Sequence, residues 1–397
     1  MTSVEEFSKN ALSFLEANAK KRVVEKSVWG EGSDVVAVLP EKTDEEEEAE
    51  VTAAKEWAQK VFDAGFGWIT GPKEFGGAEL SDPFARSYMA LEAQYDTAPQ
   101  SCRGIGLGMV APTILAHGTQ IAKEKYLRSL YRGDIIACQL FSEPGAGSDL
   151  ASVSTFARRD GDEWVLNGQK VWTSGAHYSQ IGEILCRTNL EAPKHRGLTA
   201  FIVDMKAPGV SVRPLRQMTG GASFNEVFFT DVRVPDDHRL GDVDEGWTVA
   251  LTTLMNERAA IGGGGGGVGA GSMSQRLMEL VKHVGNPDDP LVRQKLVDIY
   301  MNARVAQYTN QRAMAKIAKG QLPGPEMSIA KLSLTENMRR ICDYVSSVLG
   351  MRIIADTNQW GTYGWSTFIL GVPGMRVAGG TDEVMKNIVA ERVLRLP

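Results

Sequence analysis

Between residues 136 and 240 the chain has the pattern of β-strands, whereas the segments on either side have the pattern of helices. Runs such as Leu198–Val203 and Glu226–Pro235 are rich in β-branched and aromatic residues, and Gly or Pro residues bound them. The sequence therefore predicts a small antiparallel β domain inserted between two helical regions.

Apolar residues in the flanking regions recur at helical spacing. In the first region they form one stripe, made of Val4, Phe7, Ala11 and Phe14. In the last region the long periodic segments are 288–318, 325–349 and 381–395. We expect a mainly α-helical protein with an N-terminal helical domain over 1–135, a middle β domain over 136–240 and a C-terminal helical bundle over 241–397.

The composition excludes several classes of protein. The 397 residues are 43% hydrophobic, which is enough for a sizeable core, and the net charge of −6 provides no basic field for nucleic acid or anionic lipid. The four cysteines lie far apart without metal-ligand spacing, so we expect no metal site and a reduced, cytoplasmic protein. The N-terminus has no signal-peptide pattern, and no apolar run is long enough to span a membrane.

Two neighbouring segments favour binding of a ligand. Phe141–Asp149, with the sequence FSEPGAGSD, contains a Pro-Gly pair among small polar residues, which predicts a tight turn with exposed backbone N–H groups. Trp164–Trp172 predicts two short β-runs around an Asn167–Gly168 hairpin turn. Taken singly, each segment is equally compatible with an ordinary surface turn or hairpin.

Together these segments resemble the acyl-CoA dehydrogenase family, whose members are flavoproteins that desaturate acyl thioesters. The resemblance covers the whole chain and is strongest at 138–175, 226–260 and 374–395. It implies that FAD lies between the middle β domain and the C-terminal helices. The cofactor-binding residues that it implies are Phe141, Ser142, Gly147, Ser148, Trp172, Thr173, Ser174, Thr381 and Glu383.

Among these residues, the resemblance gives three a specific role. Trp172 would flank the isoalloxazine ring, Ser174 would place its hydroxyl at flavin N5, and Ser148 would lie where cofactor and substrate meet. The alternative for Trp172 is an ordinary aromatic side chain in a β core.

The position of the catalytic base departs from the most common family pattern. Many relatives have a Glu where this chain has Gly379, in the segment VAGGTDE. Isovaleryl- and long-chain-type relatives instead supply a Glu from an earlier helix, and Glu257 in LMNERAAIG matches that position. The resemblance thus implies that Glu257 is the base, with a pKa raised by desolvation, and that the Gly379 backbone N–H binds the thioester oxygen.

Asn256, Arg258 and Ser148 would then contact the substrate. An exposed helical charge pair is the alternative for Glu257 and Arg258.

Other segments also depart from the family pattern. Relatives usually have an Arg-x-x-Phe-Gly segment that reaches the FAD phosphates of a neighbouring subunit and a Gly-Gly-Asn-Gly loop for the dinucleotide. At these places this chain has His283–Pro290 and Leu349–Arg352. Arg293 and Gln294 are possible substitutes. Six consecutive glycines, 262–267, predict either close helix packing or a widened pocket for a long, branched or ring-bearing acyl group.

The expected function is FAD-dependent α,β-desaturation of an acyl-CoA, with an electron-transfer flavoprotein as acceptor. A flavin-dependent oxidase or monooxygenase of the same fold is one alternative. A non-catalytic subunit of a hetero-oligomeric dehydrogenase is the other, because the common base is absent. We expect a homo-oligomer, either dimer or tetramer, while a hetero-oligomer stays possible.

Overall fold

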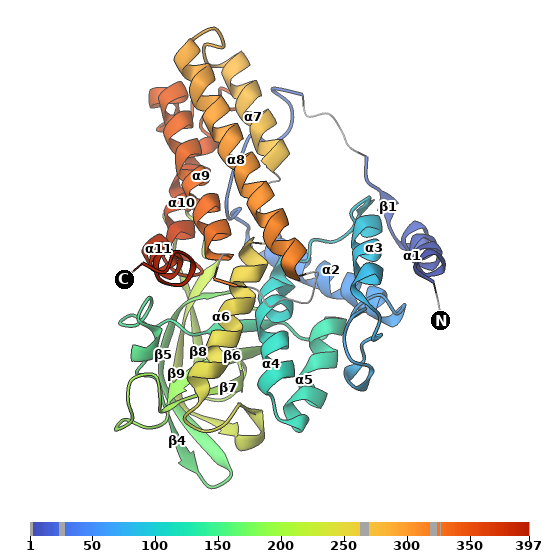
Figure 1. The fold of residues 1–397 in the computed structure, drawn as a ribbon, viewed down its shortest axis with the longest axis vertical. Coiled ribbons are helices and arrows are strands. Elements are labelled where there is room, and N and C mark those ends of the chain that lie inside the picture. The colour runs from blue at the N-terminus through green and yellow to red at the C-terminus, as the bar shows by residue number, and fades with distance from the viewer. Residues whose placement is uncertain (1–2, 24–27, 263–269, 318–323, 326, 397) are drawn as a thin grey trace. The chain divides into compact units, whose positions relative to one another are not determined.

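The computed structural model describes residues 3–23, 28–262, 270–317, 324–325 and 327–396 (Figure 1). The chain forms two compact units, which we describe separately. The first consists of Met1–Glu25, Lys42–Arg216 and Ala222–Thr253, and the second of Lys26–Glu41, Gln217–Gly221 and Leu254–Pro397.

Helices make up the first part of the first unit. Their bounds are α1 (Val4–Asn18), α2 (Asp44–Asp63), α3 (Asp82–Glu92), α4 (Ala111–His117) and α5 (Gln120–Arg132), with short turns η1 (Lys73–Phe75), η2 (Ser101–Arg103) and η3 (Gly106–Val110) and a two-stranded pair of β1 (Lys20–Lys21) and β2 (Tyr95–Asp96). The predicted apolar stripe is largely buried, since Phe7 and Ala11 of α1 lie in the core. Thr43 caps α2, where it accepts a hydrogen bond from the Glu46 backbone N–H at 3.2 Å.

An eight-stranded sheet forms the rest of this unit. Its strands are β3 (Ala137–Leu140), β4 (Phe156–Asp160), β5 (Glu163–Ser174), β6 (Ile181–Arg187), β7 (Leu198–Asp204), β8 (Val210–Leu215), β9 (Phe224–Pro235) and β10 (Arg239–Leu240), with short turns η4 (Leu150–Ser152) and η5 (Asp236–His238). The order along the sheet is β10-β7-β6-β4-β5-β9-β8, and β3 pairs with β6. Most pairs are antiparallel as predicted, whereas β3 and β4 each pair with β6 in parallel.

One turn prediction is wrong. Asn167 and Gly168 do not form a hairpin, because β5 continues through them with a shift of its register against β9. The Asn167 side chain exchanges hydrogen bonds with Asp231 of β9, at 3.0 Å each, and a Cβ at Gly168 would lie 2.4 Å from Thr155 Oγ1. Gly168 is thus needed for close approach within the sheet, and the two-residue hairpin turn is Gly161–Asp162, between β4 and β5.

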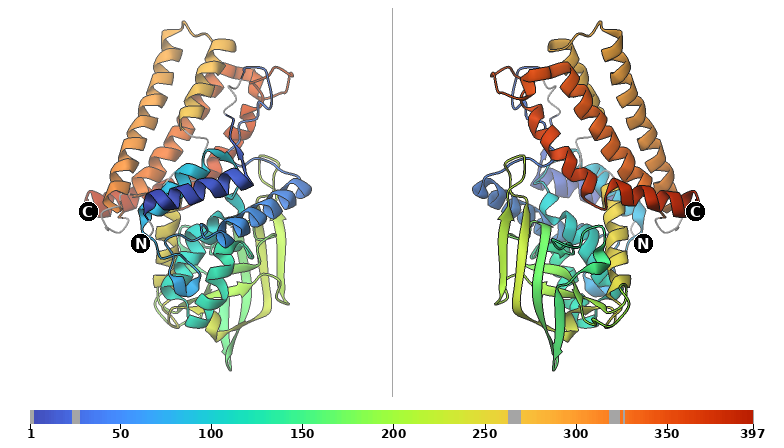
Figure 2. Two further views of the ribbon diagram at one scale, coloured as in Figure 1. Left: turned by 90° about the vertical axis from the view of Figure 1, so that its right-hand side faces the viewer. Right: turned by 90° about the vertical axis from the view of Figure 1, so that its left-hand side faces the viewer.

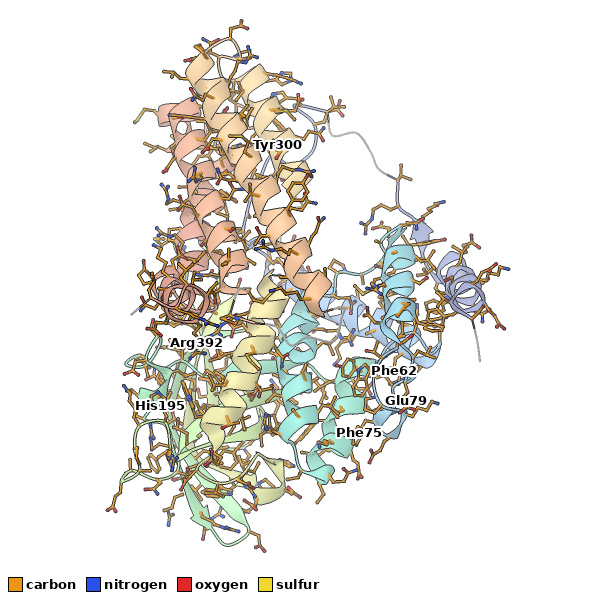
Figure 3. The ribbon with its side chains drawn as sticks, in the orientation of Figure 1. Phe62, Phe75, Glu79, His195, Tyr300 and Arg392 are labelled. Atoms are coloured by element: carbon orange, nitrogen blue, oxygen red, sulfur yellow. The ribbon has the colours of Figure 1, made fainter. Side chains whose placement is uncertain are left out.

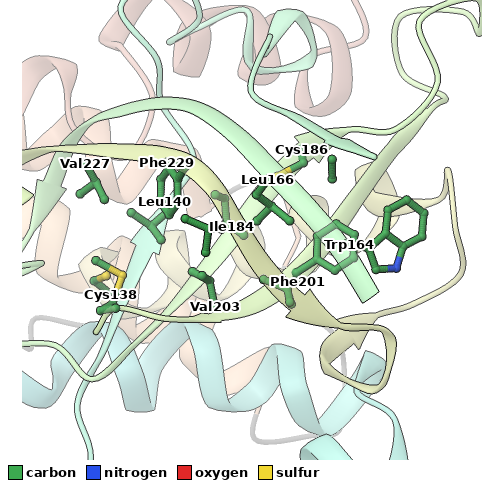
Figure 4. Close-up of a cluster of buried hydrophobic side chains, with 14 of the residues drawn as sticks. Cys138, Leu140, Trp164, Leu166, Ile184, Cys186, Phe201, Val203, Val227 and Phe229 are labelled. Carbon is green, nitrogen blue, oxygen red and sulfur yellow. The ribbon is translucent and has the colours of Figure 1, made fainter. Parts of the chain in front are cut away.

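The core of the sheet consists of alternating inward-facing side chains (Figure 4). Leu166, Ile184, Phe201 and Val203 are fully buried there, and Trp164 packs on Phe201 with ring centroids 5.3 Å apart. This packing fixes the register of β5.

The second unit is a bundle of helices. The bounds are α7 (Ala270–His283), α8 (Pro290–Ile317), α9 (Met327–Leu349), α10 (Trp365–Val377) and α11 (Asp382–Ile388), with η6 (Gly350–Ile353) after α9 and the π-helical turn η7 (Val389–Val393) after α11. Figure 2 shows α7, α8 and α9 running along one another, and their shared core includes Leu277, Ile341 and Val345. Helix α6 (Gly246–Gly262) begins in the first unit and ends in the second.

The predicted fold class, mainly helical with an inserted β domain, is confirmed. Among the described residues, no helix combines the length and the apolar character needed to cross a membrane. The exact domain boundaries that we predicted stay a prediction.

Candidate functional site

The loop from Phe141 to Asp149 is bound to strand β5. The Val171 backbone N–H donates to the Ser142 carbonyl oxygen at 2.9 Å, while Glu143 and Ala146 exchange two backbone hydrogen bonds of 3.0 Å. These bonds close the predicted tight turn and bury Phe141. The turn and β5 therefore form one structural element.

A buried ion pair strengthens this connection. Lys170 of β5 is fully buried, and its Nζ donates to three oxygens: Phe141 O at 3.0 Å, Glu143 Oε1 at 2.9 Å and Leu185 O at 2.7 Å. The Glu143 carboxylate also accepts hydrogen bonds from the Ser154 N–H and hydroxyl at 2.7 Å each, and from the Thr155 N–H at 2.9 Å. All three Lys170 protons are thus used, which is what a buried ammonium requires.

The electrostatics keep Glu143 charged. Burial raises the pKa of its carboxyl, but the Lys170 ammonium and the surrounding hydrogen bonds outweigh burial and bring the pKa to about 2. Burial lowers the pKa of Lys170, and the Glu143 carboxylate opposes that effect.

Trp172 adopts an unusual backbone conformation. Its φ is +60°, in the left-handed region that side chains other than Gly rarely occupy, and it lies where the register between β5 and β9 shifts. The indole is 62% exposed and contacts Phe224 edge-to-face, with centroids 6.1 Å apart. It is therefore a presented aromatic surface, and the alternative of an aromatic in the β core is wrong.

The two residues after Trp172 place hydroxyl groups beside it. Thr173 is buried, and its Oγ1 has no hydrogen-bond partner in the part of the chain that the structure describes. Ser174 is half-buried, and within the same described ranges no partner is found for its hydroxyl. A buried hydroxyl without a partner is rare, and a bound ligand is one way to satisfy it.

Gly147 and Ser148 lie on the exposed outer part of the loop. The neighbouring Asp149 accepts hydrogen bonds from Lys194 at 2.5 Å and Ser152 at 2.7 Å. Solvent-exposed hydrogen bonds therefore hold the outer part of the loop, whereas the buried Glu143–Lys170 pair holds the part next to β5.

The remaining predicted residues lie in the second unit. Gly379 and Gly380 have φ values of +67° and +89°, so the turn before α11 uses two left-handed residues. Thr381 is the N-cap of α11, and its Oγ1 accepts from the Val384 N–H at 3.1 Å, while Glu383 is exposed in the first turn.

A second buried ion pair holds this turn. The Asp382 carboxylate accepts from Lys331 Nζ at 2.9 Å, Thr335 Oγ1 at 2.8 Å and Arg376 Nε at 2.8 Å. Lys331 and Asp382 are both almost completely buried. The turn containing Gly379 is thereby fixed to α9 and α10.

Asn256, Glu257 and Arg258 lie on α6, in the part that belongs to the second unit, and all three are half-buried. Burial lowers the pKa of the Arg258 guanidinium, Glu257 opposes that shift, and the nearby Arg392 adds to it. Glu257 and Arg258 are therefore not a fully exposed helical charge pair.

The possible substitutes for the FAD phosphates, and the segment Leu349–Arg352 that replaces the family's Gly-rich loop, differ in their surroundings. Arg293 and Gln294 are exposed near the start of α8. Arg352 is engaged, since it donates to the Leu349 and Val348 carbonyl oxygens at 3.1 and 3.0 Å at the end of α9. Of the glycine run 262–267, only Gly262 lies within the described residues, at the end of α6.

Sequence reasoning missed the residues that fix the two turns: Glu143, Lys170, Lys331, Arg376 and Asp382. A signal existed for Lys170, because it is the one charged residue of Trp164–Trp172 and stands among apolar and small polar residues. In the described ranges no group of three or more His, Cys, Asp and Glu side chains is placed to hold a metal ion.

Comparison with known proteins places these elements in one family. Three family models match consecutive parts of the chain: the acyl-CoA dehydrogenase N-terminal domain over 33–134, the middle domain over 138–232 and the C-terminal domain over 244–394. The acyl-CoA dehydrogenase IpdE1 of Mycobacterium tuberculosis is 37% identical over 348 residues, which cover 86% of this chain and 87% of the relative.

Two solved structures are similar over nearly the whole chain. The ChsE4–ChsE5 complex from Mycobacterium tuberculosis matches with a TM-score of 0.73 and 26% identity, covering 99% of this chain and 97% of that one. The Tcur3481–Tcur3483 steroid ACAD matches with a TM-score of 0.74 and 25% identity, covering 99% and 97%.

Proposed function

Because this chain belongs to the acyl-CoA dehydrogenase family, whose members are flavoprotein oxidoreductases of lipid metabolism, we propose that it catalyses FAD-dependent α,β-desaturation of an acyl-CoA thioester. One structural observation carries the proposal: Trp172 exposes 62% of its indole from a backbone conformation with φ of +60°. Strained residues persist where the surrounding structure determines them, and they concentrate at functional sites.

The residues around Trp172 fit FAD. An aromatic face suits stacking against the isoalloxazine ring, and the Thr173 and Ser174 hydroxyls lack partners in the described chain. We assign Ser174 to flavin N5 and Phe141, Ser142, Gly147 and Ser148 to the same cofactor, because the Glu143–Lys170 pair fixes their loop on β5. On the family resemblance we also assign Thr381, which keeps its hydroxyl proton available while it caps α11, and Glu383 to FAD.

The chemistry that bound FAD would supply is that of a hydride acceptor for the β-carbon. Glu257 takes the proton from the α-carbon, so that one C–H bond breaks at each carbon and the double bond forms between them. The Gly379 N–H donates to the thioester oxygen while negative charge develops there. The positive φ of Gly379 sets the direction of this N–H, and the Asp382–Lys331 pair holds the turn in place.

We further propose a bulky, ring-bearing acyl group as substrate. Support comes from the similarity to a protein described as a steroid ACAD, and the substrate contacts would be Ser148, Asn256 and Arg258. The role of the glycine run 262–267 in this pocket stays a prediction, since nearly all of it lies outside the described residues.

An electron-transfer flavoprotein is the proposed acceptor, and α8 provides a proposed assembly surface. Val297, Tyr300, Met301, Val305 and Tyr308 are each more than half exposed, and their spacing places them on one face of α8. Tyr300 is labelled on α8 in Figure 3. An exposed apolar stripe of this kind marks an interaction surface, and we propose that a second chain of the same fold covers it. The similar structures named as two-chain complexes support this assignment.

The test is an anaerobic titration of the purified protein with acyl-CoAs of varied length and ring content, followed at the flavin band. We expect yellow protein that bulky acyl-CoAs bleach, and colourless protein that cannot be reconstituted with FAD would overturn the proposal. Rapid reoxidation of the reduced protein by air would instead favour an oxidase or monooxygenase. Bound FAD that no acyl-CoA reduces would favour a non-catalytic subunit.

Glu257→Gln tests the base. The variant should keep FAD and bind acyl-CoA, while flavin reduction slows by on the order of 10²–10⁴-fold. Glu279→Gln on α7, where the carboxylate is half-buried and paired with Lys282, is the control, with an unchanged reduction rate expected. Near wild-type reduction in Glu257→Gln would remove Glu257 from this role.

A further inference from the structure

A cavity in the helical part of the first unit is lined mainly by aromatic side chains. It has a volume of about 320 Å³ and lies between α2, α3 and the end of α5, which Figure 1 labels. The rings that line it are those of Trp57, Phe66, Trp68, Tyr88 and Tyr131. None of the described lining residues is among those assigned above to FAD or to the acyl-CoA. The cavity is therefore a candidate site of its own.

The rings give the cavity flat apolar walls. Trp68 stacks on Tyr131 with ring centroids 3.8 Å apart and 7° between the planes, and Phe66 stacks on Tyr88 at 5.2 Å and 11°. Met89 of α3 also lines the cavity and is 64% exposed, so the cavity opens to solvent at this side chain. The volume lies in the range of small-molecule sites, and flat walls suit a ligand with a planar ring system.

Arg103 provides a buried cation at this cavity. Only 7% of the residue is exposed, and among the described residues no carboxylate forms a salt bridge with its guanidinium. Its three hydrogen bonds go to neutral oxygens, which are Gln100 Oε1 at 2.7 Å, Leu130 O at 3.1 Å and Tyr131 O at 2.7 Å. Burial lowers the pKa of Arg103, because the charged form loses its hydration. A buried charge of this kind requires a counter-ion.

The surrounding residues compensate this charge only in part. Leu130 and Tyr131 belong to the last turn of α5, where the free carbonyl groups carry about half a negative charge in total. Glu92 attracts the guanidinium from beyond salt-bridge distance, and its Oε1 accepts hydrogen bonds from Trp57 Nε1 at 2.8 Å and the Tyr88 hydroxyl at 3.3 Å. A ligand carboxylate would complete the compensation, since the fork of donors on a guanidinium matches that group.

We propose that this cavity binds a small ring-bearing carboxylic acid, with its planar ring between the aromatic walls and its carboxylate at Arg103. An inorganic anion has no apolar part to cover the walls, and a ring-bearing ammonium would meet Arg103 as a like charge. Glu92 repels the carboxylate, so it directs that end of the ligand towards Arg103. The site goes beyond the proposed desaturation, because the acyl carbon of a thioester carries no free carboxylate.

The experiment compares three probes that share one ring. Isothermal titration calorimetry of the purified full chain is done with 2-naphthoate, 2-naphthamide and 2-naphthylmethylamine, which carry a negative, a neutral and a positive group. We expect 2-naphthoate to bind most tightly and the amide to bind on the order of ten-fold more weakly, the effect of losing one charge-assisted hydrogen bond. The amine should bind most weakly of the three.

Arg103→Gln should weaken 2-naphthoate binding by on the order of ten-fold and leave 2-naphthamide binding unchanged. Unchanged amide binding also shows that the cavity of the variant is intact. Arg103→Lys keeps the charge and should recover part of the 2-naphthoate affinity.

A second pair of variants locates the ligand. Ala85 of α3 lines the cavity, so Ala85→Phe should fill it and abolish binding of both 2-naphthoate and 2-naphthamide. Ala90→Phe is the matched control, because it makes the same change at an exposed position of the same helix, and it should bind both probes like wild type.

The inference is overturned if 2-naphthoate does not bind, or if the amine binds more tightly, because Glu92 would then be the anchor. Wild-type affinity in Ala85→Phe would place the ligand elsewhere. Equal losses of naphthoate and naphthamide affinity in Arg103→Gln would leave Arg103 only its bonds to α5. None of these measurements uses flavin reduction, so the proposed function can fail while this inference stands, and the reverse.

Discussion

At the scale of single residues, the Glu143–Lys170 pair decides whether the loop and β5 keep their shape. Lys170→Met should lower the free energy of unfolding by about 3–5 kcal/mol, because it leaves a buried carboxylate without its cation. Lys194→Met is the matched control: its ion pair with Asp149 is about half exposed, so a loss of about 0–1 kcal/mol is expected. Denaturant unfolding measures both variants.

Combining Lys170→Met with Glu143→Gln should recover part of the loss, since the neutral amide needs no cation and still accepts hydrogen bonds. A Lys170→Met variant as stable as the Lys194→Met control would contradict the role we give to the buried pair.

The same carboxylate predicts a pH dependence. The pKa of Glu143 is lowered from 4.5 to about 2 on folding, so its contribution is complete above pH 4.5 and is lost as the pH falls towards 2. The whole contribution is on the order of 3 kcal/mol, of which on the order of 1 kcal/mol is lost by pH 3.5. The difference in unfolding free energy between wild type and Glu143→Gln should therefore shrink between pH 6 and pH 3.5, and a constant difference would refute the assignment.

The sequence analysis named candidate site residues, which stay predictions, but it named none of the buried residues that support them. Trp172 and Ser174 were identified because their segment resembles a family motif, and the structure adds the conformation that exposes the indole. Lys170 was not identified, because a lysine in a strand is usually solvated, and only the three-dimensional position of Glu143 explains its burial. Burial of a charged pair is a tertiary property that strand periodicity does not reveal.

At the scale of elements, the irregularity of β5 at Trp172 has a structural cost, and we propose that FAD binding is its functional gain. A non-Gly residue in the left-handed region costs roughly 1 kcal/mol relative to Gly. Trp172→Gly should thus be more stable than Trp172→Ala by roughly 1 kcal/mol, because both remove the indole and only Gly relieves the strain. Thermal or denaturant unfolding of the two flavin-free proteins measures this difference.

Both variants should bind FAD more weakly than wild type, as followed by flavin fluorescence. Phe228→Ala in β9 is a control that shortens an aromatic side chain on a neighbouring strand outside the proposed site. If Trp172→Ala is at least as stable as Trp172→Gly, the strain argument fails, and if both retain wild-type FAD affinity, the proposed stacking fails.

Helices were predicted correctly where the apolar periodicity extends over many residues. The prediction failed where a dipeptide typical of turns lies inside a continuous strand. The segments 288–318 and 325–349 correspond to α8 and α9, because many apolar positions define each helix. Asn167–Gly168 was misassigned because the same dipeptide that favours a hairpin also tolerates the close approach of Thr155 and the bulge against β9. A local turn signal is outweighed when the strand on both sides of it has a full set of partners.

At the scale of the molecule, both units follow the same construction. In each, a short turn carrying proposed site residues is fixed to a regular element by a buried Lys–carboxylate pair, Glu143–Lys170 in the first and Asp382–Lys331 in the second. Buried pairs of this kind contribute more to positioning than to net stability, because desolvation offsets their attraction. The sequence alone does not show which chains assemble, since an apolar stripe has the same period whether it faces a core or a partner.

The last prediction concerns assembly through α8. Tyr300→Arg combined with Val305→Arg should convert the assembled protein into a smaller species, because two buried charges would oppose burial of the stripe in an interface. The free energy of unfolding of the single chain should change by no more than about 0.5 kcal/mol, since both side chains are more than half exposed within it. Light scattering coupled to size-exclusion chromatography measures the mass.

Met351→Arg, at an exposed residue of the same unit outside the stripe, should keep the wild-type mass. Equal masses for the double variant and wild type would exclude this face, and a wild-type chain that assembles only when mixed with a related chain would make the partner a different protein of the same fold.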